Sequence, residues 1–96
     1  MEGRIFSYIH FNGQVGSLVK ISTITDFAAR TSEFLAFGKD IALQIASTQP
    51  VDKATLMSSQ FVKDPDKSVN DLFVDMAKTL GEKVELVAYE FFGFEK

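Results

Sequence analysis

The sequence contains no cysteine, no tryptophan, two prolines and a single histidine in 96 residues. The lack of cysteine excludes disulfides and thiolate metal sites, and His10 alone cannot form a multi-histidine zinc site. No apolar run approaches the roughly 20 residues of a membrane-spanning helix, so we expect no membrane segment. Because the first residues also lack the long apolar stretch of a secretion signal, we expect a cytoplasmic protein.

Basic charge is scarce and scattered, with ten Lys and Arg against 13 Asp and Glu. A protein that follows a phosphate backbone needs a basic stripe, so we expect no direct binding to nucleic acid. Phenylalanine is abundant, with ten rings in a length that suits one domain, residues 1–96. We expect some rings to lie on a surface that another chain covers, since aromatics are enriched at interface cores. The alternative is a Phe-rich core with a few exposed rings.

Three β-strands are predicted from period-2 alternation of bulky residues. The first two, residues 4–11 and 15–22, flank Asn12-Gly13, which predicts a two-residue hairpin with a type I′ turn. Residues 83–92 alternate in the same way near the end of the chain. We therefore expect a hairpin near the N-terminus and a third strand near the C-terminus.

Two main helices are predicted between the second and third strands. One apolar stripe predicts a helix from Thr31 or Ser32 to about Thr48, formed by Phe34, Phe37, Ile41 and Ile45. A second helix over 69–80 begins at a capping box at Ser68 and ends at Gly81. Residues 50–67 form a connector with a short helical turn at 52–58. The order β-β-α-α-β predicts an α+β domain, a three-stranded antiparallel sheet with two helices on one face.

Catalytic patterns are weak in this sequence. Ser7, His10 and Asp26 could form the triad of a small hydrolase, but no nucleophile elbow surrounds the serine, so this alternative is disfavoured. Four aspartates in two close pairs lack a calcium-loop pattern and are predicted to be solvated: Asp64, Asp66, Asp71 and Asp75. We expect no metal, no cofactor, no small-molecule substrate and no enzymatic activity.

The junction Thr25-Asp26-Phe27-Ala28 places an acid beside an aromatic between a strand end and a helix start. Phe27 could project into a pocket of a partner while the Asp26 carboxylate accepts hydrogen bonds, as interface anchors do. Alternatively, Phe27 could plug the base of the first helix while Asp26 helps to cap it. The residues alone leave both interpretations open.

Several stretches resemble, in the same order, the dimerisation lobe of translation elongation factor Ts. These are residues 7–10, 13–19, 25–30, 40–46, 60–69 and 91–96. The resemblance covers essentially the whole chain. The chain is similar to a single lobe of the family, without the N-terminal helical domain of longer members.

This resemblance implies a protein that binds elongation factor Tu and promotes GDP/GTP exchange. Carried over by the family's Thr-Asp-Phe motif, Asp26 and Phe27 act on the partner, and Thr25 and Ala28 frame them. A single lobe implies a homodimer. The missing helical domain, Ile24 in place of the usual Glu, and Ala28 in place of the usual Val are departures from the pattern. The missing helical domain and Ala28 favour an alternative, a dimerising elongation factor Tu-binding or structural module that has lost exchange activity.

Overall fold

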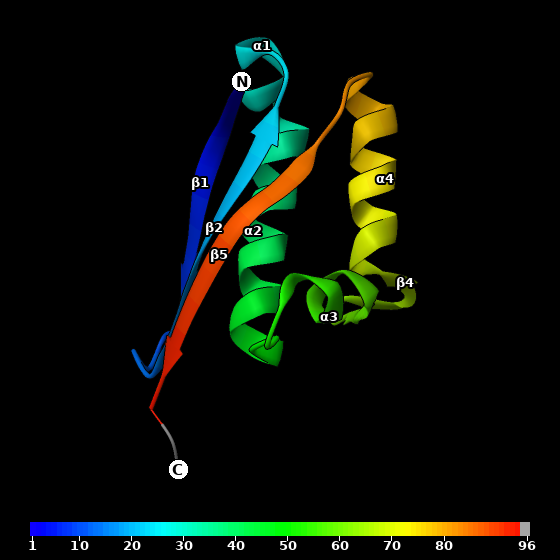
Figure 1. Cartoon of the computed structure of the whole chain (residues 1–96). Helices are drawn as coiled ribbons and strands as arrows, with labels where there is room; N and C mark the ends of the chain where they lie inside the picture. Colours follow the sequence, from blue (N-terminus) through cyan, green and yellow to red (C-terminus); the bar gives the residue numbers. More distant parts are fainter. Residues whose placement is uncertain (95–96) are drawn as a thin grey trace.

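The computed structural model describes residues 1–94. The elements follow in the order β1 (Glu2–Ile9), β2 (Val15–Thr23), α1 (Asp26–Ala29), α2 (Ser32–Thr48), α3 (Lys53–Ser58), β3 (Gln60–Phe61), β4 (Asp64–Ser68), α4 (Val69–Leu80) and β5 (Glu85–Gly93) (Figure 1). None of the helices within residues 1–94 combines the length and apolar character that crossing a bilayer requires. The last two residues of the stretch compared above, 95 and 96, lie outside the described residues.

A three-stranded antiparallel sheet in the order β1-β2-β5 forms one layer of the molecule. The register pairs Ile5 with Lys20 and Val19 with Tyr89, so β2 is hydrogen-bonded on both sides. The main helices α2 and α4 lie on one side of this sheet, with α2 directly along β1 and β2 (Figure 1). The predicted α+β fold and the order of its main elements, β1, β2, α2, α4 and β5, are confirmed.

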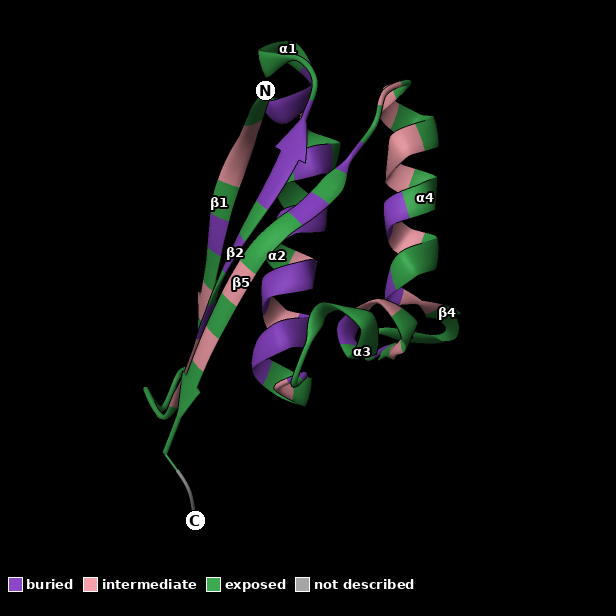
Figure 2. Cartoon of the chain, viewed as in Figure 1, coloured by how far each residue is buried: buried purple, intermediate pink, exposed green. Residues whose placement is uncertain are grey.

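The hydrophobic core lies between the sheet and α2, where buried residues face each other (Figure 2). The predicted helical stripe is buried along its whole length: Phe34, Phe37, Ile41 and Ile45. Phe6 of β1 lies directly over Gly38 of α2. Phe37 meets Phe73 of α4 edge to face, with ring centroids 4.9 Å apart. These ring contacts hold both helices against one core.

The loop between β1 and β2 differs from the prediction. The strand predicted over 4–11 begins and ends two residues earlier, which lengthens the loop. The Gly13 N–H donates to the His10 carbonyl at 2.7 Å and closes a turn. Gly13 has φ of 72°, but within residues 1–94 Gln49 is the sole non-glycine residue with positive φ, so Asn12 lacks the conformation of a type I′ turn. The predicted two-residue turn is therefore wrong.

The connector between α2 and α4 is more ordered than predicted. The short helical turn expected at 52–58 is confirmed by α3, but β3 and β4 also pair there as a small hairpin. Gln44 of α2, fully buried, ties this hairpin to the core. Its Nε2 donates to the Gln60 carbonyl at 2.9 Å, and its Oε1 accepts from the Val62 N–H at 2.8 Å. The alternation of residues gave no sign of this long-range bridge.

The start and end of α4 follow the prediction. Ser68 Oγ accepts from the Asp71 N–H at 3.1 Å, and the Asp71 carboxylate accepts from the Ser68 N–H at 3.0 Å, which completes the capping box. Gly81 ends the helix in the left-handed conformation, with φ of 73° and ψ of 20°. A glycine suits this position because other residues are strained there.

Candidate functional site

The junction after β2 forms a four-residue helix, α1, fixed at both ends by threonines. Thr25 caps its start, because its Oγ1 accepts from the Ala28 N–H at 3.2 Å. Thr31 follows its end and caps α2, accepting from the Phe34 N–H at 3.2 Å. The Thr31 hydroxyl also donates to the Ala28 carbonyl at 2.9 Å. A helix this short has little stability of its own, so these bonds fix its orientation.

Phe27 points away from the protein, with 83% of its surface exposed. The two residues that follow it, Ala28 and Ala29, are buried instead. The interpretation in which Phe27 plugs the base of the first helix is therefore wrong. Ala28 supports α1 from beneath and offers a partner no surface, so its smaller size relative to valine affects core packing rather than direct contact.

The Asp26 carboxylate is paired within the chain. Its Oδ2 accepts from Arg30 Nη1 at 3.1 Å, and its Oδ1 lies 3.5 Å from Arg4 Nη2. The hydrogen bond from Arg30 and the charges of both arginines hold the pKa of Asp26 below its ordinary value of 3.8. Asp26 is thus ionised at neutral pH, and it ties α1 to β1. Its suggested role as a cap of the first predicted helix is wrong, since that helix is α2 and Thr31 caps it; Asp26 is instead the first residue of α1, which Thr25 caps.

Glu82, which follows α4, is a member of this site that the sequence analysis missed. Its Oε1 accepts from the Ile24 N–H at 2.8 Å and from the Thr25 N–H at 2.9 Å. Its Oε2 accepts from the Thr25 hydroxyl at 3.0 Å. The hydrogen bond from the Thr25 backbone is the main cause that lowers the pKa of Glu82 from its ordinary value of 4.5. Glu82 lies 57 residues from Thr25, so no local pattern could have found it, whereas Arg30 stands four residues after Asp26 and could have been identified.

The residues of the hydrolase alternative have other partners. His10 Nδ1 lies 2.9 Å from the Tyr8 hydroxyl, and Asp26 binds arginines, so the structure does not assemble the triad. Of the close aspartates, Asp71 belongs to the capping box and Asp75 pairs with Lys67 at 2.8 Å. Within residues 1–94, no three His, Asp or Glu side chains are grouped so that they could hold a metal ion.

Comparison with known proteins gives the junction a family context. The profile of the family described as "Elongation factor TS" matches residues 24–94, a range that includes α1 and Glu82. Elongation factor Ts of Rubrobacter xylanophilus is 33% identical over a match that covers 93% of this chain and 70% of that protein. Elongation factor Ts of Syntrophobacter fumaroxidans is 26% identical, with 86% and 64% covered.

The relatives are longer than this chain. A third, elongation factor Ts of Desulfitobacterium hafniense, is 30% identical, and the match covers 59% of its length. In the Rubrobacter xylanophilus match, 93% of this 96-residue chain is spread over 137 aligned positions. The matched region is therefore about half as long again in that relative, which carries internal residues without a counterpart here. The family profile and the Rubrobacter xylanophilus match nevertheless establish that this chain belongs to the elongation factor Ts family.

Proposed function

We propose that this chain binds elongation factor Tu through the junction Thr25–Ala28 and promotes GDP/GTP exchange, as a cytoplasmic protein without enzymatic activity. The observation that carries the proposal is Phe27, a large apolar ring with 83% of its surface exposed on a helix capped at both ends. An exposed ring on a fixed backbone is ready to fill a pocket with little loss of conformational freedom. Membership of the elongation factor Ts family supports elongation factor Tu as the owner of that pocket.

Phe27 provides binding energy and Asp26 adds polar recognition in this proposal. Burying a phenylalanine side chain contributes about 1.5–3 kcal/mol. Asp26 keeps acceptor capacity beside its arginine bonds, because each carboxylate oxygen has two lone pairs. If the chain binds nucleotide-free elongation factor Tu more tightly than the GDP-bound form, it must weaken GDP binding by the same coupling free energy. Exchange then follows from differential binding, and no covalent bond changes.

The test is the release rate of fluorescently labelled GDP from elongation factor Tu, with binding measured in the same samples. We expect this protein to accelerate release, and Phe27→Ala to abolish the acceleration and weaken binding by roughly tenfold or more. Phe11→Ala is the matched control, because Phe11 is also an exposed ring (93%) but lies on the β1–β2 loop at the opposite end of the sheet (Figure 1). An equal loss in both variants, or unchanged binding by Phe27→Ala, contradicts the proposed role of this ring.

A second outcome supports the alternative of a binding module that has lost exchange. The missing internal residues relative to the Rubrobacter xylanophilus protein favour this alternative, because they remove surface that could contact a partner. Binding that depends on Phe27 without faster GDP release supports the alternative. A chain that does not bind elongation factor Tu overturns both.

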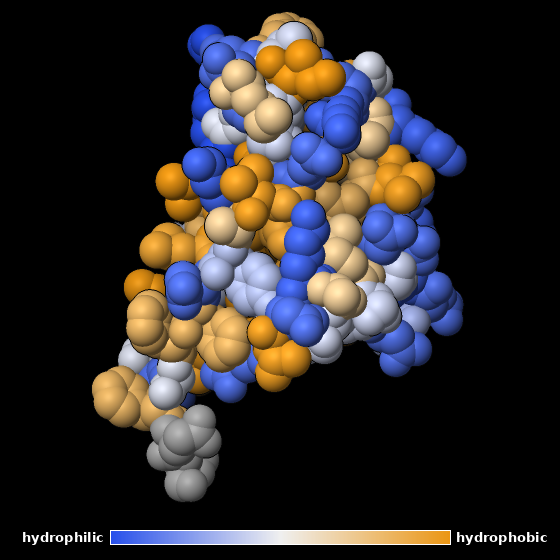
Figure 3. Space-filling model, in the orientation of Figure 1, coloured by the Kyte–Doolittle hydropathy of each residue, from blue (hydrophilic) through white to orange (hydrophobic). Residues whose placement is uncertain are grey.

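We also propose that two copies of the chain form a homodimer through the outer sheet face, the side of the sheet that faces away from the helices. Large apolar side chains with about half or more of their surface exposed gather there: Ile5, Ile9, Leu18, Val87 and Phe92. In Figure 3, orange hydrophobic side chains lie along the left margin of the molecule, on the side of the sheet. An exposed apolar face of this kind is typical of a protein interface.

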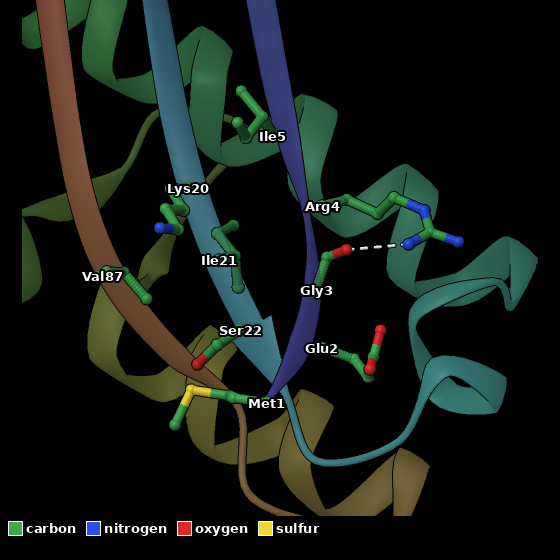
Figure 4. A pocket seen from close by; sticks show the side chains of 9 residues that line it. All are labelled: Met1, Glu2, Gly3, Arg4, Ile5, Lys20, Ile21, Ser22 and Val87. Atoms are coloured by element: carbon green, nitrogen blue, oxygen red, sulfur yellow. Dashed lines mark hydrogen bonds between the residues drawn. The ribbon is translucent and has the colours of Figure 1, made fainter.

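The outer sheet face is hollowed at two places and carries charges of both signs. One hollow, of about 540 Å³, lies over β1, β2 and β5 between Ile5 and Val87 (Figure 4). The other is lined in part by Leu18 and Phe92. Lys20 lines the first hollow and Glu90 the second. In a twofold dimer, a face that carries both charges can pair Lys20 of one copy with Glu90 of the other copy.

The oligomeric state tests this interface without elongation factor Tu. Sedimentation or light scattering should give the mass of a dimer for the wild type. Leu18→Glu places a charge in the middle of the face and should give a monomer, whereas Phe27→Ala should remain a dimer. A monomeric wild type at high concentration, or a dimeric Leu18→Glu variant, contradicts the interface.

A further inference from the structure

We propose that Glu82 is a positioning residue for the partner-binding junction, which it holds in place from the far end of the chain. This inference rests on the function proposed above. Glu82 accepts three hydrogen bonds from the two residues that precede α1, at 2.8, 2.9 and 3.0 Å. Its hydrogen bonds go to Ile24 and Thr25, and in this proposal it does not touch the partner. Its effect passes through the backbone of Ile24 and Thr25.

The backbone between β2 and α1 needs an acceptor that neither element provides. The N–H groups of Ile24 and Thr25 lie after the last residue of β2 and before the first residue of α1. Both residues are exposed, so without an acceptor from the protein these N–H groups would bond to water, which does not fix the direction of the backbone. The Glu82 carboxylate supplies that acceptor to both and thereby fixes the direction in which the chain leaves the sheet.

The hydrogen bonds continue from Glu82 into α1 through the Thr25 hydroxyl. This hydroxyl donates to Glu82 Oε2 at 3.0 Å and accepts from the Ala28 N–H at 3.2 Å. The hydroxyl gives its single proton to Glu82 and uses a lone pair to accept from Ala28, so both bonds can exist at the same time. The helix cap that orients Phe27 is therefore itself oriented by Glu82.

Glu82 is in turn placed by the end of α4. The N–H groups of Gly81 and Glu82 both donate to the Ala77 carbonyl, at 2.8 and 3.2 Å, so the chain reverses tightly after the helix. The left-handed conformation of Gly81 turns Glu82 back toward the sheet. Because α4 is fixed in the core through Phe73, the carboxylate has a rigid support. The second half of the chain thus determines the geometry of a site in the first half.

Removal of the Glu82 carboxylate should loosen the backbone before α1 without unfolding the domain. The ring of Phe27 would then sample more orientations, and binding would have to restore the lost order. Ordering one mobile side chain costs a binding reaction roughly two- to tenfold in affinity. Binding to the partner should therefore weaken, and this loss should depend on the presence of the Phe27 ring.

The experiment compares Glu82→Ala, Glu82→Gln and the matched control Glu85→Ala. Glu85 begins β5 three residues later, is exposed, and pairs with Lys83 at 3.4 Å, so its removal changes net charge equally without touching the junction. Glutamine keeps one oxygen that can accept from both N–H groups and should restore most of the function. Denaturation midpoints are measured for each variant, and the glutamine variant keeps the test valid if alanine prevents folding.

The first measurement is amide hydrogen exchange of the free protein by NMR. In Glu82→Ala the Ile24 and Thr25 amides should exchange about tenfold faster or more, as local opening becomes easier, while the amides of α2 keep their rates. Glu82→Gln and Glu85→Ala should resemble the wild type. Unchanged exchange at Ile24 and Thr25 in Glu82→Ala overturns the proposal.

The second measurement is affinity for elongation factor Tu in a double-mutant cycle. Glu82→Ala should weaken binding by roughly two- to tenfold in the wild type and have no further effect in the Phe27→Ala background. If Glu82→Ala weakens binding equally in both backgrounds, the positioning role is overturned. Unchanged affinity despite faster amide hydrogen exchange also overturns it, and in both cases the proposed function stands. A wild-type chain that does not bind overturns the proposed function, and the positioning role falls with it.

Discussion

The close contact between Phe6 and Gly38 predicts whether Gly38→Ala stabilises or destabilises the protein, and this outcome tests the packing of β1 on α2. A Cβ atom built on Gly38 would overlap three carbons of the Phe6 ring, Cδ2, Cε2 and Cζ. The ring cannot easily move aside, because Phe6 is only 7% exposed and packs edge to face on Phe34 with centroids 5.5 Å apart. Gly38→Ala should therefore destabilise the protein, although glycine is a poor helix former.

Two opposing contributions set the size of this effect. Replacing glycine by alanine inside a helix stabilises by about 1 kcal/mol. Overpacking a close-packed core costs about 1–3 kcal/mol, and the upper part of that range applies here because a rigid ring is displaced. The net expectation is a loss of about 1–2 kcal/mol in the free energy of unfolding, or roughly 1 M urea in the midpoint.

Urea denaturation of four variants separates the contributions. Ala36→Gly, on the exposed side of the same helix, measures the helix propensity alone and should cost about 1 kcal/mol. Phe6→Leu removes the ring, and in that background Gly38→Ala should become neutral or stabilising, since neighbouring substitutions couple. A higher midpoint for Gly38→Ala in the otherwise wild-type protein would refute the close contact between β1 and α2.

Other predictions address the connector, the core and the junction. Gln44→Leu leaves two backbone groups of the β3–β4 hairpin without their partner, which should cost about 2 kcal/mol and lower Tm by roughly 10 °C; an unchanged Tm would contradict this bridge. Leu56→Ala, at a fully buried position, should cost about 3 kcal/mol in urea denaturation, and a loss below 1 kcal/mol would contradict its burial. The folded pKa of Asp26 is lowered, so its ion pairs stabilise the junction above pH 3.8 and this stabilisation is lost as pH falls through the lower folded pKa. An NMR titration should give a pKa for Asp26 below 3.8 that rises in Arg30→Ala, and an equal value in both would contradict the pairing.

The parts of the fold that depend on near neighbours were predictable from the sequence. The stripe from Phe34 to Ile45 follows helical spacing, and the capping box at Ser68 needs only residues within three positions. The hairpin turn at Asn12-Gly13 was mispredicted, because a dipeptide preference does not determine how many residues a loop takes up. The β3–β4 hairpin escaped prediction because it is held by Gln44, from a helix 16 residues earlier.

The junction Thr25–Ala28 also has features that the sequence predicts and features that only the folded structure shows. The sequence by itself determined the motif Asp26-Phe27, its place between a strand and a helix, and the family that it resembles. The tertiary structure decided that Phe27 faces outward, that Asp26 is paired with Arg4 of the first strand, and that Glu82 supports the backbone. Periodicity and caps act within a few residues, whereas exposure and these hydrogen bonds depend on which distant segments the folded chain brings together.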